Sequence, residues 1–561
     1  MRKDYARFYQ PGVPATIDEP TDSLVELLET AVAQAGSRQA LDFFGRRTSY
    51  RDLGEKVERV AEGLRLLGVS AGDRVALILP NCPQHVIAFY AVLRLGAIVV
   101  EHNPLYTARE LRHMFEDHAA RVVICWDKAI DNVLSQPGDI GFDHIISVNM
   151  IEEFPLVKRL ALKIPLPSLM ATRAKLTAKV PRGGRILAWK KLLDSNKLSP
   201  SYPRPGVRDT AAIQYTSGTT GLPKGAVLTH SNLYSNAIQG HAWTQDVRIG
   251  HEVLYAALPF FHAFGLTLFM TFGILKQARI HLFPTPDVDL IMAAAKVDPP
   301  TFFVGVPPLC ETVANASIKR KISLKSIKSA ISGAMTLPED IRVLWEGVTG
   351  GKLIEGYGMT ESSPVTLGNP FHTTRKPGTV GVPFPSTFAK LVDVDDNSRE
   401  VETGERGELW VKGPQVFHGY WNNPEETAKS LVDGVWLRTG DIAIQDEDGF
   451  TTIVDRIKEL IITGGFNVAP TEVEQVLRAH PSVADAAVVG LPSSRSGETV
   501  VAAVIPEAGE VVDSDSVRAF CRARLAAYKV PRKIILVDSL PKSLLGKVLR
   551  GQVRTDLLTL V

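Results

Sequence analysis

The chain has 561 residues, of which 45% are hydrophobic and 22% charged, with a formal net charge of +2 at pH 7. This length corresponds to about three or four units of ordinary domain size, and the balanced charge gives no reason to expect nucleic acid as a partner. Its four cysteines show no C-x-x-C spacing, so we expect neither a zinc site nor a redox pair. We expect the protein to reside in a reducing compartment. The first ten residues carry charges without an apolar stretch behind them and predict no secretory signal.

Helix-like and strand-like patterns alternate over the first 150 residues. Apolar residues at helical spacing predict helices over 23–35 and 83–95. Buried apolar runs predict strands over 73–79, 98–100, 121–125, 301–306 and 329–332. Strand and helix in turn predict an α/β fold class, with mainly parallel sheets covered by helices.

The segment 155–191 is strongly basic, with ten Lys or Arg residues and no Asp or Glu. Leucines lie between the basic residues. Two interpretations remain open: a solvated basic face, or an amphipathic patch that lies on an anionic membrane surface. We favour membrane contact. Aromatic residues are not interleaved with the basic ones, so nucleic acid is not expected here.

Residues 215–225 read Y-T-S-G-T-T-G-L-P-K-G. Glycines allow successive backbone N–H groups to point into one concavity, which suits an anion. Hydroxyl groups donate hydrogen bonds, and Lys224 adds a mobile positive charge. A surface turn of ordinary Gly, Ser and Thr residues is the alternative. The chain has no Walker A string, and this loop is predicted to hold phosphates in another way.

The segment 253–275 runs for 23 residues without a charge, which is long enough to cross a bilayer. Its first half contains Pro259, His262 and Gly265 in the string P-F-F-H-A-F-G. We therefore expect a buried helix preceded by a loop, with a membrane or re-entrant segment as the alternative.

Residues 355–361 read E-G-Y-G-M-T-E. Tyr357 offers a flat face for a purine, Thr360 can donate to a phosphate, and Glu361 is a hard oxygen ligand suited to Mg²⁺. Glycines here are expected to let the backbone approach a ligand. A glutamate-capped loop without a ligand is the alternative for this string taken alone.

From about residue 379 the sequence pattern changes to short runs of alternating apolar and polar residues, separated by turns that contain Gly, Pro and Asn. This pattern predicts a small antiparallel β unit over 379–454. Beyond it, helix and strand patterns predict a compact α+β domain. We therefore divide the chain into an N-terminal domain, 1–454, and a smaller C-terminal domain, 455–561. The boundary at 455–459 is charged and not glycine-rich, which favours a defined hinge over a flexible linker.

The motifs at 215–225 and 355–361 resemble the phosphate and adenine–magnesium signatures of the adenylate-forming superfamily, which includes acyl-CoA synthetases, aryl-CoA ligases, luciferases and peptide-synthetase adenylation domains. The resemblance extends from 73 to 547 with every motif in family order, and is closest to bacterial long-chain fatty acid–CoA ligases. It implies an AMP-binding N-terminal domain, a mobile C-terminal domain, and Mg²⁺ at Thr216 and Glu361. The residues it implies for ATP binding are Thr216, Ser217, Gly218, Thr219, Thr220, Gly221, Lys224, Gly333, Ala334, Gly356, Tyr357, Gly358, Met359, Thr360, Asp441 and Arg456.

The C-terminal motifs take their roles from the same resemblance. Asp441 is implied to bind the ribose, and Arg456 the ribose or a phosphate. Lys458 is implied to be the hinge about which the small domain turns between two catalytic poses. Lys547, in G-K-V-L-R, resembles the catalytic lysine of adenylation.

Two further segments are implied to contact the other substrates. Gly464, Gly465 and Phe466 resemble the loop that lines the path of coenzyme A, although Thr463 stands where some relatives carry lysine. His262, Phe264 and Gly265 resemble the wall of the acyl pocket, and we place His262 with Lys547 and Glu361 among the catalytic residues. The gating tryptophan of a bacterial long-chain relative has no counterpart just after this histidine.

The expected activity is ATP-dependent activation of a medium- to long-chain fatty acid to acyl-AMP, followed by thioester formation with coenzyme A. An aryl-CoA ligase of the coumarate type is the nearest alternative, and a catalytically silent lipid- or acyl-adenylate-binding protein at the membrane is another. The chain has no G-x-S-x-G elbow, so a serine hydrolase is not supported. The expected location is cytoplasmic, with peripheral contact at the inner face of the membrane. Oligomeric state is not predicted.

Overall fold

The computed structural model describes residues 5–181, 183–216, 223–463, 466–493, 497–543 and 546–560. Contacts within the chain divide it into two compact units. Unit 1 comprises Met1–Gly218, Leu222–Phe388 and Val411–Leu437, and unit 2 includes Ala389–Trp410 and Arg438–Val561. The boundary that we place at residue 455 remains a prediction.

Unit 1 contains a seven-stranded sheet in the order β7-β6-β5-β3-β4-β8-β9. Neighbouring strands from β7 to β8 are parallel, and only β9 runs antiparallel, against β8. The strands are β3 (Arg74–Ile78), β4 (Ile98–Glu101), β5 (Val122–Trp126), β6 (His144–Val148), β7 (Ile186–Ala188), β8 (Thr210–Thr216) and β9 (Lys224–Thr229). The strands expected near 73–79, 98–100 and 121–125 are confirmed within one or two residues.

A nine-stranded sheet follows the order β16-β15-β14-β13-β12-β10-β11-β1-β2. Its centre, from β14 to β1, is parallel, and antiparallel strands lie at both ends. The strands are β1 (Gln39–Phe43), β2 (Arg46–Ser49), β10 (Val253–Ala256), β11 (Arg279–Leu282), β12 (Phe302–Gly305), β13 (Ser329–Ser332), β14 (Lys352–Gly358), β15 (Val365–Gly368) and β16 (Val382–Pro383). β12 and β13 are fully buried and match the runs expected at 301–306 and 329–332. The sequence of β12, F-F-V-G, is typical of a parallel strand that is buried on both faces.

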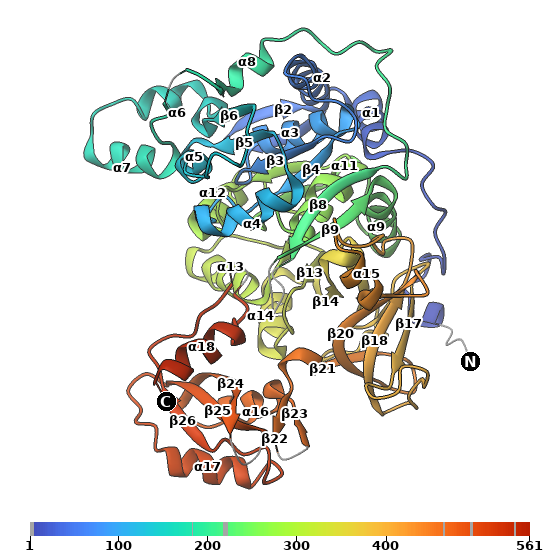
Figure 1. The fold of residues 1–561 in the computed structure, drawn as a ribbon, viewed down its shortest axis with the longest axis vertical. Helices are drawn as coiled ribbons and strands as arrows, with labels where there is room; N and C mark the ends of the chain where they lie inside the picture. The colour runs from blue at the N-terminus through green and yellow to red at the C-terminus, as the bar shows by residue number, and fades with distance from the viewer. Residues whose placement is uncertain are drawn as a thin grey trace. The chain divides into compact units, whose positions relative to one another are not determined.

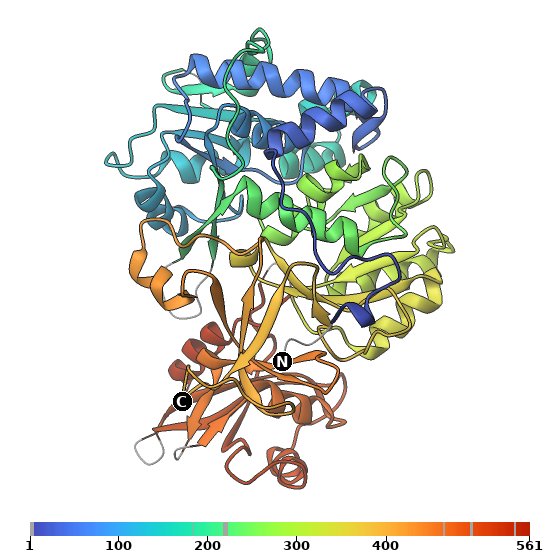
Figure 2. The same cartoon turned by 90° about the vertical axis from the view of Figure 1, so that its right-hand side faces the viewer.

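Helices connect these strands and cover their faces (Figure 1). They are α1 (Leu24–Ala35), α2 (Tyr50–Leu66), α3 (Pro83–Arg94), α4 (Ala108–His118), α5 (Ile130–Leu134), α6 (Leu156–Ala161), α7 (Pro167–Leu176), α8 (Trp189–Leu193), α9 (His230–Trp243), α12 (Val288–Ala295), α13 (Pro307–Arg320), α14 (Glu339–Thr349) and α15 (Pro424–Ser430). The blue helices α1 and α2 lie side by side in Figure 2. Ser23 begins α1 with a reciprocal capping box to Glu26, which satisfies backbone donors that have no partner within the helix.

The uncharged segment 253–275 is only partly helical. Its first four residues form β10 between β11 and β12, and a loop then leads into α10 (Ala263–Gly265), a π-helical turn (Leu266–Thr271) and α11 (Phe272–Leu275). The predicted buried helix after a loop is confirmed, but the opening strand was not expected. In the described part of the chain, no helix has the length and apolar character needed to cross a membrane.

The predicted small antiparallel unit is a five-stranded sheet in the order β17-β18-β20-β19, with β21 paired to β20. Its strands are β17 (Phe388–Val392), β18 (Arg406–Lys412), β19 (Leu431–Val432), β20 (Trp436–Gln445) and β21 (Thr451–Arg456). A short turn, Ile457–Glu459, follows β21.

The remainder of unit 2 is a mixed sheet with helices on both faces. The order is β23-β22-β25-β24, with β26 parallel to β25. Its elements are β22 (Ile461–Thr463), β23 (Phe466–Val468), α16 (Pro470–Arg478), β24 (Val483–Ser493), β25 (Gly497–Pro506), α17 (Ser514–Arg522), β26 (Lys533–Leu536) and α18 (Arg550–Leu560). This confirms the α+β fold expected for the C-terminal part of the chain.

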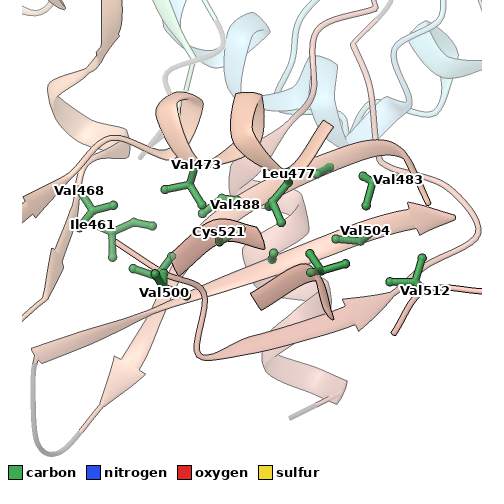
Figure 3. Close-up of a cluster of buried hydrophobic side chains, with 14 residues drawn as sticks. Ile461, Val468, Val473, Leu477, Val483, Val488, Val500, Val504, Val512 and Cys521 are labelled. Carbon is green, nitrogen blue, oxygen red and sulfur yellow. The ribbon is translucent and has the colours of Figure 1, made fainter. Parts of the chain in front are cut away.

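Alternate residues of β24 and β25 form two separate cores. Val488, Val500 and Val504 point into one cluster with residues of α16 and α17 (Figure 3). Their neighbours in sequence, such as Val489 and Val501, enter a second cluster that includes residues of α18. Because successive strand residues face opposite sides and each large apolar side chain contributes about 1.5–3 kcal/mol when fully buried, this part of unit 2 is stabilised on both faces.

Candidate active site

The predicted phosphate loop joins two antiparallel strands. Thr216 at the end of β8 is the register partner of Lys224 at the start of β9, and its hydroxyl Oγ1 donates to the Lys224 carbonyl at 3.5 Å. The predicted ATP-binding residues between them, Ser217, Gly218, Thr219, Thr220 and Gly221, lie outside the described residues. The described ends of the loop therefore form the base of a hairpin in unit 1.

Lys224 is engaged by an acidic partner that sequence reasoning did not identify. Its Nζ forms an ion pair with Glu426 on α15 and lies 5.4 Å from the centre of the Tyr420 ring. Hydrogen bonds from Lys224 and Lys429 lower the pKa of Glu426 to about 2. Glu426 therefore stays ionised at neutral pH and neutralises Lys224.

Tyr420 connects this lysine to the predicted metal ligand. Its hydroxyl donates to Glu361 Oε1 at 2.7 Å, and the backbone N–H of Phe417 donates to the Glu361 carbonyl at 2.9 Å. Glu361 is only 6% exposed. Burial, followed by the charge of Glu361, raises the pKa of Tyr420, so its phenol remains a donor. Residues predicted from two distant motifs thus meet through a tyrosine from a third segment.

The segment containing Tyr420 is held against the hairpin by backbone contacts. Trp421 N donates to the Gly225 carbonyl at 2.7 Å, and Val227 N donates to the Gly419 carbonyl at 3.0 Å. The string H-G-Y-W-N-N-P-E-E at 418–426 has the composition of a turn followed by a helix start. No spacing within it indicates a binding role, so only its tertiary pairing with β9 identifies Tyr420 and Glu426.

The glycines of 355–361 serve the packing of the motif itself. Gly356, Tyr357 and Gly358 end β14, and Met359, Thr360 and Glu361 follow at a short helical turn. A side chain at Gly358 would place its Cβ 1.8 Å from the Pro364 carbonyl oxygen, and one at Gly356 would lie 3.3 Å from Ile331. The close approach of the Pro364 backbone therefore explains on its own why residue 358 is glycine.

The predicted acyl segment meets the strand end at 332–334. A Cβ on Gly333 would lie 3.0 Å from the ring of Phe264, and Phe264 is itself buried. A Cβ on Gly265 would lie 2.0 Å from the Pro259 carbonyl oxygen, so the chain turns back on itself there. Ala334 adopts a left-handed φ of 66° directly after Gly333. The structure therefore brings Phe264 and Gly333, from separate predicted motifs, into contact.

His262 begins α10 and caps it. Its ring nitrogen Nδ1 accepts the backbone N–H of Phe264 at 3.3 Å. Burial lowers the pKa of His262 to about 4. The imidazole is therefore neutral near pH 7, and its proton resides on Nε2, because Nδ1 acts as the acceptor.

Glu355 is the first residue of the 355–361 motif and is 6% exposed. Its carboxyl oxygen Oε2 accepts the backbone N–H of Leu337 at 3.2 Å. Burial raises the pKa of Glu355 to about 8, an effect that the Leu337 hydrogen bond only partly opposes. Glu355 therefore holds the segment after Ala334 while remaining largely protonated at neutral pH.

In unit 2, Asp441 and Arg456 face each other across the antiparallel pair of β20 and β21. Arg456 Nε lies 3.0 Å from Asp441 Oδ1. Asp441 is buried, whereas the Arg456 side chain is 38% exposed. The two residues predicted to contact the ribose thus form one ion pair at neighbouring positions.

Lys547 lies in a tight turn of the same unit. Its backbone N–H donates to Ser543 Oγ at 3.2 Å and its carbonyl accepts the Ser543 N–H at 2.7 Å. Gly546 has a φ of 81°, which favours glycine. Burial first, and then the charge of Arg456, lowers the pKa of Lys547, while Glu459 and Asp441 oppose that shift. The predicted catalytic lysine is therefore in the electrostatic field of the Asp441–Arg456 pair.

The other predicted residues of unit 2 are only partly described. Lys458 lies in the turn Ile457–Glu459. Gly464 and Gly465 are outside the described residues, as is the side chain of Phe466; the flanking Thr463 and Phe466 are partners in the antiparallel β22–β23 pair. Among the described residues, no group of three or more His, Cys, Asp or Glu side chains is arranged to hold a metal.

Solved structures share this architecture, and curated proteins are similar to this chain in sequence along most of its length. ATP-bound MatB from Rhodopseudomonas palustris has a TM-score of 0.79 and 29% identity, covering 95% of this chain and 98% of that chain. A long-chain-fatty-acid–CoA ligase of Bacillus subtilis (strain 168) is 37% identical over 551 residues, covering 98% of this chain and 97% of that protein. A feruloyl-CoA synthase of Amycolatopsis is 34% identical over 513 residues, covering 91% and 94% respectively.

The fold and these relatives define an ATP-dependent adenylate-forming enzyme. The AMP-binding enzyme family matches residues 28–421, and the AMP-binding enzyme C-terminal domain matches residues 472–547. The chain belongs to the AMP-binding enzyme family. The resemblance inferred from the two motifs at 215–225 and 355–361 is therefore confirmed.

Replacing Glu355 with glutamine tests its buried protonation. The folded-state pKa of about 8 exceeds that of a solvated carboxyl, so wild-type stability is lost as pH rises between these two values. Glu355→Gln retains an oxygen acceptor for Leu337 N and cannot ionise. We expect the melting temperature of the variant, relative to wild type, to rise by several degrees between pH 6 and pH 9 in thermal unfolding scans. A difference that is constant with pH would contradict this assignment.

Proposed function

We propose that this protein is a fatty acid–CoA ligase that forms acyl-AMP from ATP and a medium- to long-chain fatty acid, and then transfers the acyl group to coenzyme A. The observation that carries the proposal is the similarity to the Bacillus ligase along almost the entire length of both chains. The site residues support it because Lys224 and Lys547 carry positive charge that can compensate the negative charge of phosphates.

In the first half-reaction, a carboxylate oxygen of the fatty acid attacks the α-phosphorus of ATP, and pyrophosphate leaves. Both reactants are anionic, so positioned cations supply most of the stabilisation. Lys547 is the residue that we assign to the α-phosphate and the carboxylate, and Lys224 with Thr216 to the pyrophosphate end. Lys224 exchanges Glu426 for phosphate when ATP binds.

Glu361 suits Mg²⁺ because this ion usually takes one or two carboxylates together with substrate phosphates and waters, not an all-protein cage. The carboxylate is buried, and its described side-chain contact is the single hydrogen bond from Tyr420, which leaves acceptor capacity for a cation. Thr216 is the second residue that would hold the ion. Bound Mg²⁺ would neutralise charge on the phosphates.

In the second half-reaction, the thiol of coenzyme A attacks the acyl carbonyl of acyl-AMP, the thioester forms and AMP leaves. We assign the hinge to Lys458 and the coenzyme A contact to Gly464, Gly465 and Phe466. Rotation at the hinge withdraws Lys547 from the acyl-AMP. Neutral His262 at the acyl segment can donate from Nε2 without adding charge beside the acyl group.

The apolar wall of Phe260, Phe264 and Leu266 favours an aliphatic acid, since all three side chains are buried. An aryl-CoA ligase is the second candidate, supported by the similarity to feruloyl-CoA synthase. We place a silent lipid-binding protein third, because Lys547 and Asp441 are both present and share one electrostatic environment.

The decisive assay measures coenzyme A-dependent AMP release with fatty acids of increasing chain length beside coumarate, ferulate and benzoate. We expect the highest kcat/KM for a medium- or long-chain fatty acid. A higher value for an aryl acid would select the aryl-CoA ligase. Absence of AMP and pyrophosphate release with every acid would select the silent binding protein.

Lys547→Ala separates the two half-reactions. Removing a cation that acts only in the adenylation transition state should slow acyl-AMP formation on the order of 10²–10³-fold. Thioester formation from supplied acyl-AMP should be nearly unchanged. Pyrophosphate release and single-turnover thioester formation measure the two steps. Equal losses in both steps would reject the two-pose assignment.

We also propose a cytoplasmic protein that contacts anionic membrane surfaces through the segment 155–191. Helices α6 and α7 lie at the margin of unit 1 in Figure 1. Exposed apolar side chains occur along them between basic ones, which suits the interface of an anionic bilayer. The exposed apolar residues are Leu156 (67%), Val157 (79%), Leu160 (53%), Ile164 (47%), Leu166 (52%) and Met170 (57%).

Reversing two charges in this segment tests the contact. Lys163 and Arg173 are exposed, and each basic residue near an anionic surface contributes about 1 kcal/mol. Lys163→Glu with Arg173→Glu should weaken binding to phosphatidylglycerol-containing vesicles by roughly tenfold or more in sedimentation assays. The control carries Lys296→Glu and Lys319→Glu, which are exposed elsewhere in unit 1. Equal weakening by both pairs would indicate non-specific charge attraction.

A further inference from the structure

Arg550, at the start of α18, is the centre of a partly buried charge cluster in unit 2. Its side chain is 16% exposed. Its guanidinium donates to both carboxylate oxygens of Glu474, at 2.8 and 2.7 Å, and to Thr471 Oγ1 at 2.7 Å. It also forms an ion pair with Glu459, and Nη1 lies 3.7 Å from Asp455 Oδ1.

Two of these partners lie on opposite sides of Lys458. Asp455 belongs to β21 and is fixed to β20 as the register partner of Ile442. Glu459 follows Lys458 and begins the part of the chain that contains α16 and α18. A single guanidinium group, through Nη1, thus contacts the segment before the hinge and the segment after it.

A second contact links Asp455 to the same helix. Its Oδ2 accepts the backbone N–H of Thr471, in the first turn of α16, at 2.9 Å, while Oδ1 accepts the N–H of Arg456 at 2.8 Å. Asp455 is 4% exposed. Burial raises its pKa, and Arg550 and the two backbone donors oppose that shift. Its ionised form therefore depends on the contacts with Arg550 and Thr471.

These contacts respond differently to rotation at Lys458. Thr471, Glu474 and Glu459 all follow Lys458 in the chain, so their bonds to Arg550 are retained when the C-terminal part turns as a body. Asp455 precedes Lys458 and stays with β20. Its bonds to Arg550 and to Thr471 N must therefore break. In the structure, these bonds coexist with Lys547 in the field of Asp441 and Arg456.

We propose that Asp455 and Arg550 form a latch that holds the adenylation pose, and that releasing this latch is part of the change to the thioester-forming pose. The inference rests on the proposed two-step function. Both are positioning residues: they act by keeping Lys547 in the electrostatic field of the Asp441–Arg456 pair. A buried carboxylate separated from its cation is costly, so the latch opens only where water can reach Asp455 in the rotated pose.

The test is Asp455→Asn, which removes the charge and retains an oxygen for one backbone donor. Losing a partly buried ion pair shifts a two-state equilibrium on the order of tenfold. The ratio of the thioester to the adenylation rate constant should rise by about that factor. The rates are those of single-turnover thioester formation from supplied palmitoyl-AMP and of pyrophosphate release from palmitate and ATP. Trypsin should also cleave faster after Arg456 or Lys458.

Asp485→Asn is the matched control. Asp485 is a partly buried aspartate paired with Arg478 and Lys542, which both follow the hinge. Its loss should leave the ratio and the cleavage rate unchanged. Arg550→Lys retains charge but loses the planar group that holds Glu474 through Nε and Nη2 while Nη1 contacts Glu459 and Asp455. It should raise the ratio in the same direction as Asp455→Asn.

The outcomes separate the latch from other roles. If Asp455 only supported the neighbouring Arg456, both half-reactions would slow together, because each uses the adenylate site, and the latch would be rejected. An unchanged ratio in a folded Asp455→Asn variant would also reject it. Failure of wild-type protein to release pyrophosphate with any acid would instead reject the proposed function.

Discussion

A lysine proposed to bind phosphate must remain available among the protein's own carboxylates, and Lys224 and Lys547 meet this constraint differently. Lys224 is held by Glu426, a carboxylate whose pKa is lowered to about 2. Lys547 is half-buried in the electrostatic field of the Asp441–Arg456 pair, where desolvation and Arg456 lower its pKa. Because Asp441 already has an arginine partner at 3.0 Å, its charge is compensated without Lys547. In the proposed mechanism the first lysine would exchange Glu426 for phosphate, whereas the second has a neighbouring carboxylate that is already paired.

Tyr420 extends this arrangement by separating two acidic groups that serve different purposes. Its hydroxyl donates to Glu361 and its ring faces Lys224, which in turn pairs with Glu426. The phenol does not ionise in this environment, so it can satisfy Glu361 without neutralising it. A lysine in place of Tyr420 would form an ion pair with the Glu361 carboxylate. A neutral donor orients Glu361 without compensating its charge, which suits the Mg²⁺ contact that we propose for it.

The fold was largely predictable because its signals are local. Apolar runs gave β3, β12 and β13, and capping residues such as Ser23 set helix starts. The phosphate and adenine motifs were found through residue types that are unusual together. Tyr420 and Glu426 were not found, because their role depends on Trp421 pairing with Gly225 about two hundred residues away. The role of Gly358 was also invisible in sequence, since the atom that excludes a side chain there belongs to Pro364. The periodicity of apolar residues indicates which side chains are buried. It does not indicate which other segment of the chain each of these residues contacts.

The two-sided core of the C-terminal part has a mechanical consequence. With α16 and α17 contributing to the core on one face of β24–β25 and α18 on the other, bending within this part would break packing on at least one face. The rotation that we propose would therefore fall in the short segment between Asp455, which is paired into the β20–β21 ladder, and Glu459. Arg550 lies at the start of α18 and binds Glu474 of α16, so it connects elements that contribute to the two cores. A residue placed there therefore connects the packing on both faces of β24–β25 to Glu459, next to the hinge that we propose at Lys458.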